Sequence, residues 1–186
     1  MERLKDIEVD ESWTLFLDRD GTINIKLEDN YVKNWAEFEF IEGALKSLGT
    51  FAKLFSRIII VTNQQGIGKE LMTHEDLADI HKKMVKVIEY YGGRIDQIYY
   101  CPFLALPEPT CRKPMPGMAI QSQQDFPEID FSKSIMVGDS KSDIDFGNRL
   151  GMKTVMIVRE SYTQSEYNAD LCVSGLEELI SYLKTT

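Results

Sequence analysis

Five short apolar runs recur along the chain, and a longer stretch with the spacing of an amphipathic helix separates each from the next. The runs are WTLFL, RIIIVT, QIYYC, SIMVG and KTVMIV. Continuous apolar strands that alternate with helices are typical of a parallel sheet covered by helices on both faces. The sequence therefore predicts an α/β fold, a three-layer doubly wound parallel sheet.

The length of 186 residues fits a single domain, which we expect to span residues 1–186. Thr73, followed three residues later by Asp76, predicts the start of a helix that ends at Gly92. Two segments, residues 21–40 and 102–116, lack helical periodicity. Neither is long enough to form an independent cap domain, so we expect loops that border an open site.

The charge disfavours some classes of partner, and the cysteine content bears on where the protein functions. Thirty acidic and 21 basic residues give a net charge of -9, which disfavours polynucleotides and anionic membranes. Three cysteines make no dense disulfide framework, and no segment has the roughly 18 apolar residues of a membrane-spanning helix. We expect a cytoplasmic protein that is a monomer or a weak homo-oligomer and binds a small molecule.

Polar residues gather where the predicted strands end, and the carboxyl ends of parallel strands form the ligand-binding edge of such sheets. They are Asp18 and Asp20 after the first strand, Thr62 and Asn63 after the second, Arg112 and Lys113 in the loop after the third, and Asp139 with Asp143 after the fourth. Taken singly, each has a structural explanation, because an Asp pair before Gly21 often forms a turn and a loop lysine is often solvated. Their joint occurrence at strand ends favours a catalytic site.

This set of groups suits phosphoryl transfer. One aspartate can attack phosphorus and a second can protonate the leaving oxygen, while a lysine and a hydroxyl bind the other phosphate oxygens. Carboxylates as close as Asp18 and Asp20 repel one another unless a cation lies between them or one of them holds a proton. Oxygen ligands favour Mg²⁺, which we expect between Asp18, the backbone carbonyl of Asp20, and Asp139.

Four motifs resemble those of the haloacid dehalogenase superfamily of phosphohydrolases, in the same order along the chain. They are LFLDRDGTIN at 15–24, IIIVTNQQGIG at 58–68, CRKPMPGM at 111–118 and IMVGDSKSDI at 135–144. Within the superfamily, DRDGTIN, FEFIEGA and RKPMPG are similar to the subgroup of D-glycero-D-manno-heptose 1,7-bisphosphate and histidinol-phosphate phosphatases. The resemblance implies a phosphatase that acts on a small sugar phosphate, with removal of the 7-phosphate of the heptose.

The resemblance also implies a role for individual residues. Asp18 would be the nucleophile and Asp20 the general acid and base. Thr62 and Lys113 would bind the transferring phosphoryl group. Asn63, Gln64 and Arg112 would bind the rest of the substrate. Asp18, Asp20 and Asp139 would hold Mg²⁺.

The sequence departs from the subgroup in the loop before Lys113. That loop usually binds zinc through a Cys-x-His and a Cys-x-Cys pair, but Phe103 and Pro109 stand where two of the four ligands are expected, beside Cys101 and Cys111. A structural zinc site needs four ligands, so we expect no zinc here. Instead, we expect Pro102, Pro107, Pro109 and Pro114 and apolar packing to hold the loop.

Three alternatives remain open on the sequence alone. Histidinol phosphate is another small substrate of the same subgroup. A nucleic-acid end phosphatase is disfavoured by the acidic charge, because the densest basic cluster is HKKMVK on a predicted helix. A non-catalytic binding module is disfavoured because all the predicted catalytic acids and Lys113 are present.

Overall fold

The computed structural model describes residues 7–28, 30–106, 109–158 and 168–185. Six parallel strands form the central sheet in the order β4-β3-β2-β5-β6-β7. The strands are β2 (Thr14–Leu17), β3 (Arg57–Asn63), β4 (Gln97–Cys101), β5 (Ser134–Gly138), β6 (Lys153–Ile157) and β7 (Leu171–Val173). All five predicted strands are therefore confirmed, and β7 extends the sheet by one strand.

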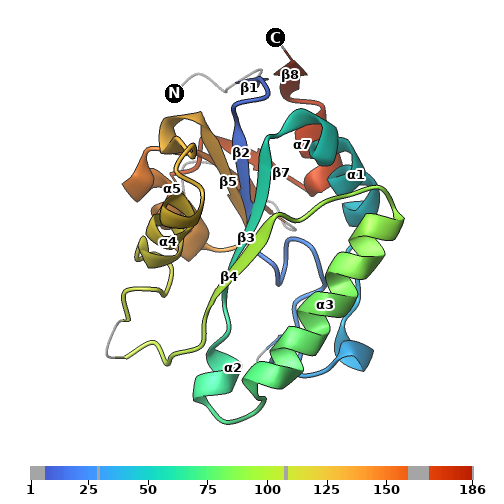
Figure 1. Cartoon of the computed structure of the whole chain (residues 1–186), viewed down its shortest axis with the longest axis vertical. Helices are drawn as coiled ribbons and strands as arrows, with labels where there is room; N and C mark the ends of the chain where they lie inside the picture. The colour runs from blue at the N-terminus through green and yellow to red at the C-terminus, as the bar shows by residue number, and fades with distance from the viewer. Residues whose placement is uncertain (1–6, 29, 107–108, 159–167, 186) are drawn as a thin grey trace.

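Helices cover both faces of this sheet, as Figure 1 shows with the sheet seen nearly edge-on. One face carries α1 (Ala44–Leu54), α3 (His74–Tyr90) and α7 (Leu176–Ile180), and the other carries α4 (Gly117–Asp125) and α5 (Lys141–Leu150). Shorter helical segments are η1 (Trp35–Glu37), α2 (Gln65–Gly68) and η2 (Phe131–Lys133). Layers on both sides confirm the predicted three-layer arrangement.

The strands are mostly apolar because each face of the sheet meets its own core. Leu15 and Leu17 of β2 pack with residues of α1 and α3, whereas Phe16 between them packs with α4 and α5 on the opposite face. All three of these side chains are fully buried. Alternate side chains of a strand point to opposite faces, so a strand covered on both sides is apolar at most of its positions.

A separate two-stranded sheet pairs the two ends of the described chain. β1 (Ile7–Val9) lies parallel to β8 (Leu183–Thr185), and both strands lie at the same end of the molecule in Figure 1. Ile7 and Val9 are buried, so the pairing extends the apolar core beyond the central sheet.

The helix start predicted at Thr73 is confirmed by its hydrogen bonds. Thr73 caps α3 in a capping box, in which its hydroxyl accepts from the Asp76 backbone N–H and the Asp76 carboxylate accepts from the Thr73 backbone N–H. None of the helices in the described ranges has both the length and the apolar character needed to cross a membrane.

Candidate active site

Three carboxylates meet at the carboxyl end of the central sheet. Asp18 follows β2, Asp139 follows β5, and Asp143 lies in the first turn of α5; one oxygen from each lies within 4.8 Å of the others. β2 and β5 are adjacent and parallel, so their ends place Asp18 beside Asp139. Asp18 and Asp143 are buried, and Asp139 is half-buried.

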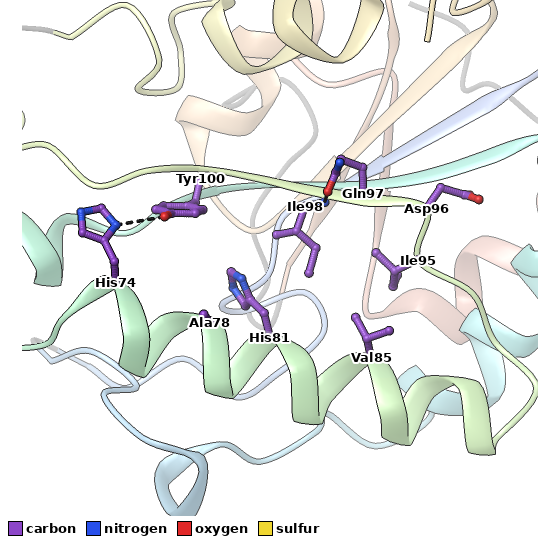
Figure 2. A pocket seen from close by; sticks show the side chains of 9 residues that line it. All are labelled: His74, Ala78, His81, Val85, Ile95, Asp96, Gln97, Ile98 and Tyr100. Carbon is purple, nitrogen blue, oxygen red and sulfur yellow. Dashed lines mark hydrogen bonds between the residues drawn. The ribbon is translucent and has the colours of Figure 1, made fainter. Parts of the chain in front are cut away.

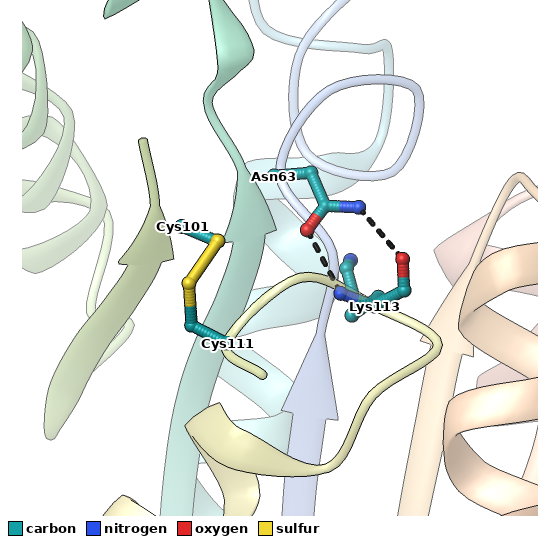
Figure 3. Close-up of a disulfide and its surroundings, with 4 residues drawn as sticks. All are labelled: Asn63, Cys101, Cys111 and Lys113. Carbon is teal, nitrogen blue, oxygen red and sulfur yellow. Dashed lines mark hydrogen bonds between the residues drawn. A yellow bond between two sulfur atoms is a disulfide. The ribbon is translucent and has the colours of Figure 1, made fainter. Parts of the chain in front are cut away.

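A buried ammonium group partly neutralises this cluster. Lys113 Nζ lies 2.7 Å from Asp18 Oδ1 and 2.6 Å from Asp143 Oδ1. The backbone of Lys113 is fixed by Asn63, whose side-chain oxygen accepts from the Lys113 N–H (3.0 Å) and whose amide donates to the Lys113 carbonyl (3.2 Å; Figure 3). The end of β3 thus positions the lysine that follows β4.

The carboxylates of the cluster are in surroundings that disfavour their ionised forms, so a bound cation would stabilise them. Burial raises the pKa of Asp18 to about 7, against the opposing effect of Lys113. Burial also raises the pKa of Asp139, although Lys26 opposes this. Three carboxylates close together, with one lysine between two of them, form a site in which a hard divalent cation would stabilise the ionised forms.

Lys26 already supplies a positive charge at Asp139. Its ammonium lies 2.8 Å and 3.2 Å from the two carboxylate oxygens of Asp139. Gly21 lies directly against the same carboxylate: its φ is +93°, and a Cβ built on it would lie 2.1 Å from Asp139 Oδ2. Both the backbone conformation and the close approach therefore require glycine at this position.

Asp20 is held apart from the three clustered carboxylates by a set of donors. Its Oδ1 accepts from Arg19 Nη2 (2.8 Å) and Asn24 Nδ2 (3.0 Å), and its Oδ2 accepts from Gln64 Nε2 (2.8 Å). Burial raises the pKa of Asp20, but the Arg19 charge and these hydrogen bonds outweigh it and lower that pKa below its usual value.

The remaining predicted residues lie at or below one cavity. Gln64 is buried beneath it and also donates to Thr62 Oγ1 (2.9 Å). Arg112 Nη1 is buried and has no hydrogen-bond partner among the described residues. The cavity has a volume of about 220 Å³ and is lined by Asp18, Asp20, Lys26, Thr62, Asn63, Arg112, Lys113, Asp139, Ser140, Ser142 and Asp143.

The structure thus brings every predicted site residue except Gln64 to the wall of one cavity. That Asn63 and Gln64 bind substrate stays a prediction, because in this structure both amides bond to protein groups. Asp143 was predicted to lie at this edge of the sheet but was given no individual role, although its position in the GDSKSD motif was a signal. Lys26 was not predicted at all, because a lysine in a loop without a motif carries no signal.

The loop before Lys113 differs from the expectation that prolines and apolar packing hold it. Cys101, at the end of β4, and Cys111 form a disulfide, with their Cα atoms 5.4 Å apart (Figure 3). Cys101 ends β4, and Cys111 lies ten residues later, directly before Arg112 and Lys113, so the disulfide ties the part of the loop that carries these two residues to the end of β4. Of the four prolines, Pro107 lies outside the described residues.

Comparisons with known proteins agree with this geometry. Residues 110–179 match the family described as HAD-hydrolase-like. A D-glycero-alpha-D-manno-heptose-1,7-bisphosphate 7-phosphatase of Mycobacterium bovis is 38% identical over 138 residues, which cover 74% of this chain and 73% of that protein. A D-glycero-beta-D-manno-heptose-1,7-bisphosphate 7-phosphatase of Photorhabdus laumondii is 32% identical, with 91% of this chain and 94% of that protein covered.

A solved structure gives the same result for the fold. D,D-heptose 1,7-bisphosphate phosphatase from B. bronchiseptica, complexed with magnesium and phosphate, superimposes with a TM-score of 0.77 and 25% sequence identity. The match covers 90% of this chain and 98% of that structure.

Proposed function

Because this chain belongs to the haloacid dehalogenase-like phosphatases, we propose that it removes the 7-phosphate from D-glycero-D-manno-heptose 1,7-bisphosphate. Support for this substrate comes from relatives named for both anomers, one of which matches 91% of the chain. Within the site, the observation that carries the proposal is the buried pairing of Asp18 with Lys113 on the wall of a small polar cavity. An ammonium beside a carboxylate can bind the oxygens of a phosphoryl group as that carboxylate attacks it.

In the first proposed step, Asp18 Oδ attacks phosphorus and the bond from phosphorus to the sugar oxygen breaks. The proton that the sugar oxygen needs comes from Asp20. Lys113 and the Thr62 hydroxyl bind the phosphoryl oxygens during the transfer. The product of this half-reaction is an aspartyl phosphate on Asp18 and a free sugar hydroxyl.

In the second step, a water molecule attacks the phosphorus of the aspartyl phosphate. Asp20, now ionised, takes the proton of this water, and the bond to Asp18 breaks to release inorganic phosphate. The Arg19 charge and the hydrogen bonds that lower the pKa of Asp20 favour the ionised form needed in this step, so Asp20 must hold the proton taken from water until the next sugar oxygen leaves. At the end of the cycle Asp18 is again a free carboxylate and Asp20 again carries the proton that it donates in the first step.

We propose Mg²⁺ as the cofactor, held by Asp18, Asp139 and the backbone carbonyl of Asp20. The residues fit such an ion, since two buried carboxylates and a half-buried one converge and Lys26 already places a cation at Asp139. When bound, Mg²⁺ neutralises charge on the phosphoryl oxygens. Arg112, whose Nη1 has no partner among the described residues, is suited to bind the second phosphate of a bisphosphate.

The proposal is tested with a panel of phosphate esters in the presence of Mg²⁺. The panel contains both anomers of the heptose bisphosphate, histidinol phosphate and a 5'-phosphorylated oligonucleotide, and NMR identifies which phosphate is lost. We expect the bisphosphate to have the highest kcat/KM and to yield the 1-phosphate. The Asp18→Asn variant, which cannot form the acyl phosphate, serves as the control for contaminating phosphatases. A higher kcat/KM for histidinol phosphate or the oligonucleotide would assign the chain a different substrate.

A further inference from the structure

We propose that Arg19 and His81 form a buried positioning pair that holds Asp20 in place for proton transfer. This inference rests on the proposed role of Asp20 as the acid and base. It assigns a function to two residues outside the cavity wall, one within the DRDG motif and one on α3.

Arg19 lies between the two catalytic aspartates in the sequence and is completely buried. Arginine is almost never fully buried unless it is paired. Its Nη2 donates to Asp20 Oδ1 at 2.8 Å, which makes the one ion pair found for Arg19 among the described residues. Because Arg19 is buried, water screens the Arg19–Asp20 ion pair less than it screens an ion pair on the surface.

His81 supplies the second partner of this guanidinium. It projects from α3 toward β4, below Tyr100, as Figure 2 shows, and it is 9% exposed. Its Nε2 lies 3.3 Å from Arg19 Nη1. Because an arginine can only donate, His81 Nε2 must accept, so the ring is neutral and carries its proton on Nδ1. Burial and the charge of Arg19 keep it neutral, lowering its pKa to about 3.

The two contacts together fix the orientation of the guanidinium. The group is planar and rigid, so a partner at Nη1 restricts where Nη2 points. Among the residues that the structure describes, two side chains donate hydrogen bonds to Asp20 Oδ1, those of Arg19 and Asn24. Without His81, Arg19 can rotate away, and Asp20 then keeps Asn24 on Oδ1 and Gln64 on Oδ2. Without His81 we therefore expect the Asp20 carboxyl group to remain in the site but to be less well placed for proton transfer.

The test uses the dependence of turnover on the leaving group. An acid matters most for a poor leaving group such as a sugar alkoxide and least for an activated aryl phenolate. The measured quantity is the ratio of kcat on a sugar phosphate to kcat on an aryl phosphate. Asp20→Asn is the reference variant and should lower this ratio by about a hundredfold or more.

His81→Leu removes the acceptor and keeps an apolar group of similar size. We expect it to lower the ratio by about tenfold, since misplacing a catalytic group by about 1 Å can cost up to a hundredfold. His81→Gln can place an amide oxygen near the position of Nε2 and should restore the ratio. The matched control is His74→Leu on the same helix, because His74 is exposed and bonds to the Tyr100 hydroxyl instead (2.9 Å; Figure 2).

A double-mutant cycle with Arg19→Met shows whether His81 acts through Arg19. In that background His81→Leu should lower the ratio no further. This double variant contains no unpaired buried guanidinium, so it also serves if His81→Leu alone fails to fold. A parent-like ratio in the double variant, or equal losses for His81→Leu and His81→Gln, would overturn the inference. Equal losses on both substrates for Asp20→Asn would instead show that Asp20 is not the acid, and the inference would fail with that role.

Discussion

Replacing Lys113 with methionine tests the electrostatic core of the site, because it removes the cation that lies between Asp18 and Asp143. The Lys113 side chain is 2% exposed, and its ammonium forms ion pairs of 2.7 Å and 2.6 Å. Removing one partner of a buried ion pair costs about 3–5 kcal/mol, because the other charge stays buried without compensation. In a chain of this size, 1 kcal/mol shifts Tm by about 2–4 °C. We therefore expect Lys113→Met to lower Tm by roughly 6–20 °C without Mg²⁺ at pH 8.

The stability lost in Lys113→Met should depend on pH, in a direction set by the pKa of Asp18. Burial raises its pKa in the folded protein to about 7, above the usual value of 3.8. The folded state then binds the proton more tightly than the unfolded state, so stability falls as pH rises from about 4 to about 7. Without the Lys113 ammonium this pKa rises further, so the fall extends to higher pH. The Tm difference between parent and variant should thus be larger at pH 8 than at pH 5.

Thermal melting with and without Mg²⁺ measures this prediction, and Lys83→Met is the matched control. The Lys83–Asp79 ion pair has the same length of 2.7 Å, but its side chains are 47% and 52% exposed. Exposed pairs contribute about 0–1 kcal/mol, so the control should melt within about 4 °C of the parent. Mg²⁺ should recover part of the stability of Lys113→Met by supplying the missing charge. A Tm change no larger than that of the control, or one that is the same at pH 5 and pH 8, would refute the reasoning.

Three further changes test other parts of the site. Lys26→Met removes the ammonium that pairs with Asp139, an ion pair worth ~0.2–1 kcal/mol, so calorimetry should show Mg²⁺ binding about 1.4- to fivefold more tightly; weaker binding would mean that Lys26 does not compete with the metal. Gly21→Ala places a Cβ on the Asp139 carboxylate and should abolish Mg²⁺ binding, whereas Gly151→Ala, which also has a positive φ but open space around it, should leave binding unchanged. Replacing both disulfide cysteines with serine opens a short loop and should cost about 2–3 kcal/mol, seen as a lower Tm that dithiothreitol reproduces in the parent; an unchanged Tm would show that the disulfide does not hold the loop.

The sequence predicts the central sheet well because burial on both faces leaves a strong signal. Runs such as RIIIVT hold several consecutive apolar residues, without the alternation of a strand that has one solvated face, and each predicted run became a strand. β1, β7 and β8 were missed because each has only three residues, too few to establish a pattern. Residues that follow a strand, such as Asp18 and Asp139, could be placed in the site because parallel strands end at one edge.

The parts of the site that could not be predicted depend on contacts between distant segments. Arg19 and His81 are 62 positions apart, and nothing in either local sequence indicates that they meet. Lys26 reaches Asp139 across 113 positions from a loop without regular structure. The pairing of Cys101 with Cys111 could not be predicted either. The loss of two expected zinc ligands does not indicate what holds the loop in place of the metal.

The central claim, that Asp18 carries the phosphoryl group during hydrolysis of a sugar bisphosphate, is tested most directly by trapping the intermediate. The enzyme is mixed with heptose bisphosphate labelled in the 7-phosphate and quenched in acid during the first turnover, and the peptides are then analysed by mass spectrometry. We predict that the label appears transiently on the peptide containing Asp18, at that residue, and that Asp18→Asn carries none. Label on another residue, or phosphate release at the parental rate with no labelled peptide at any time, would contradict the account.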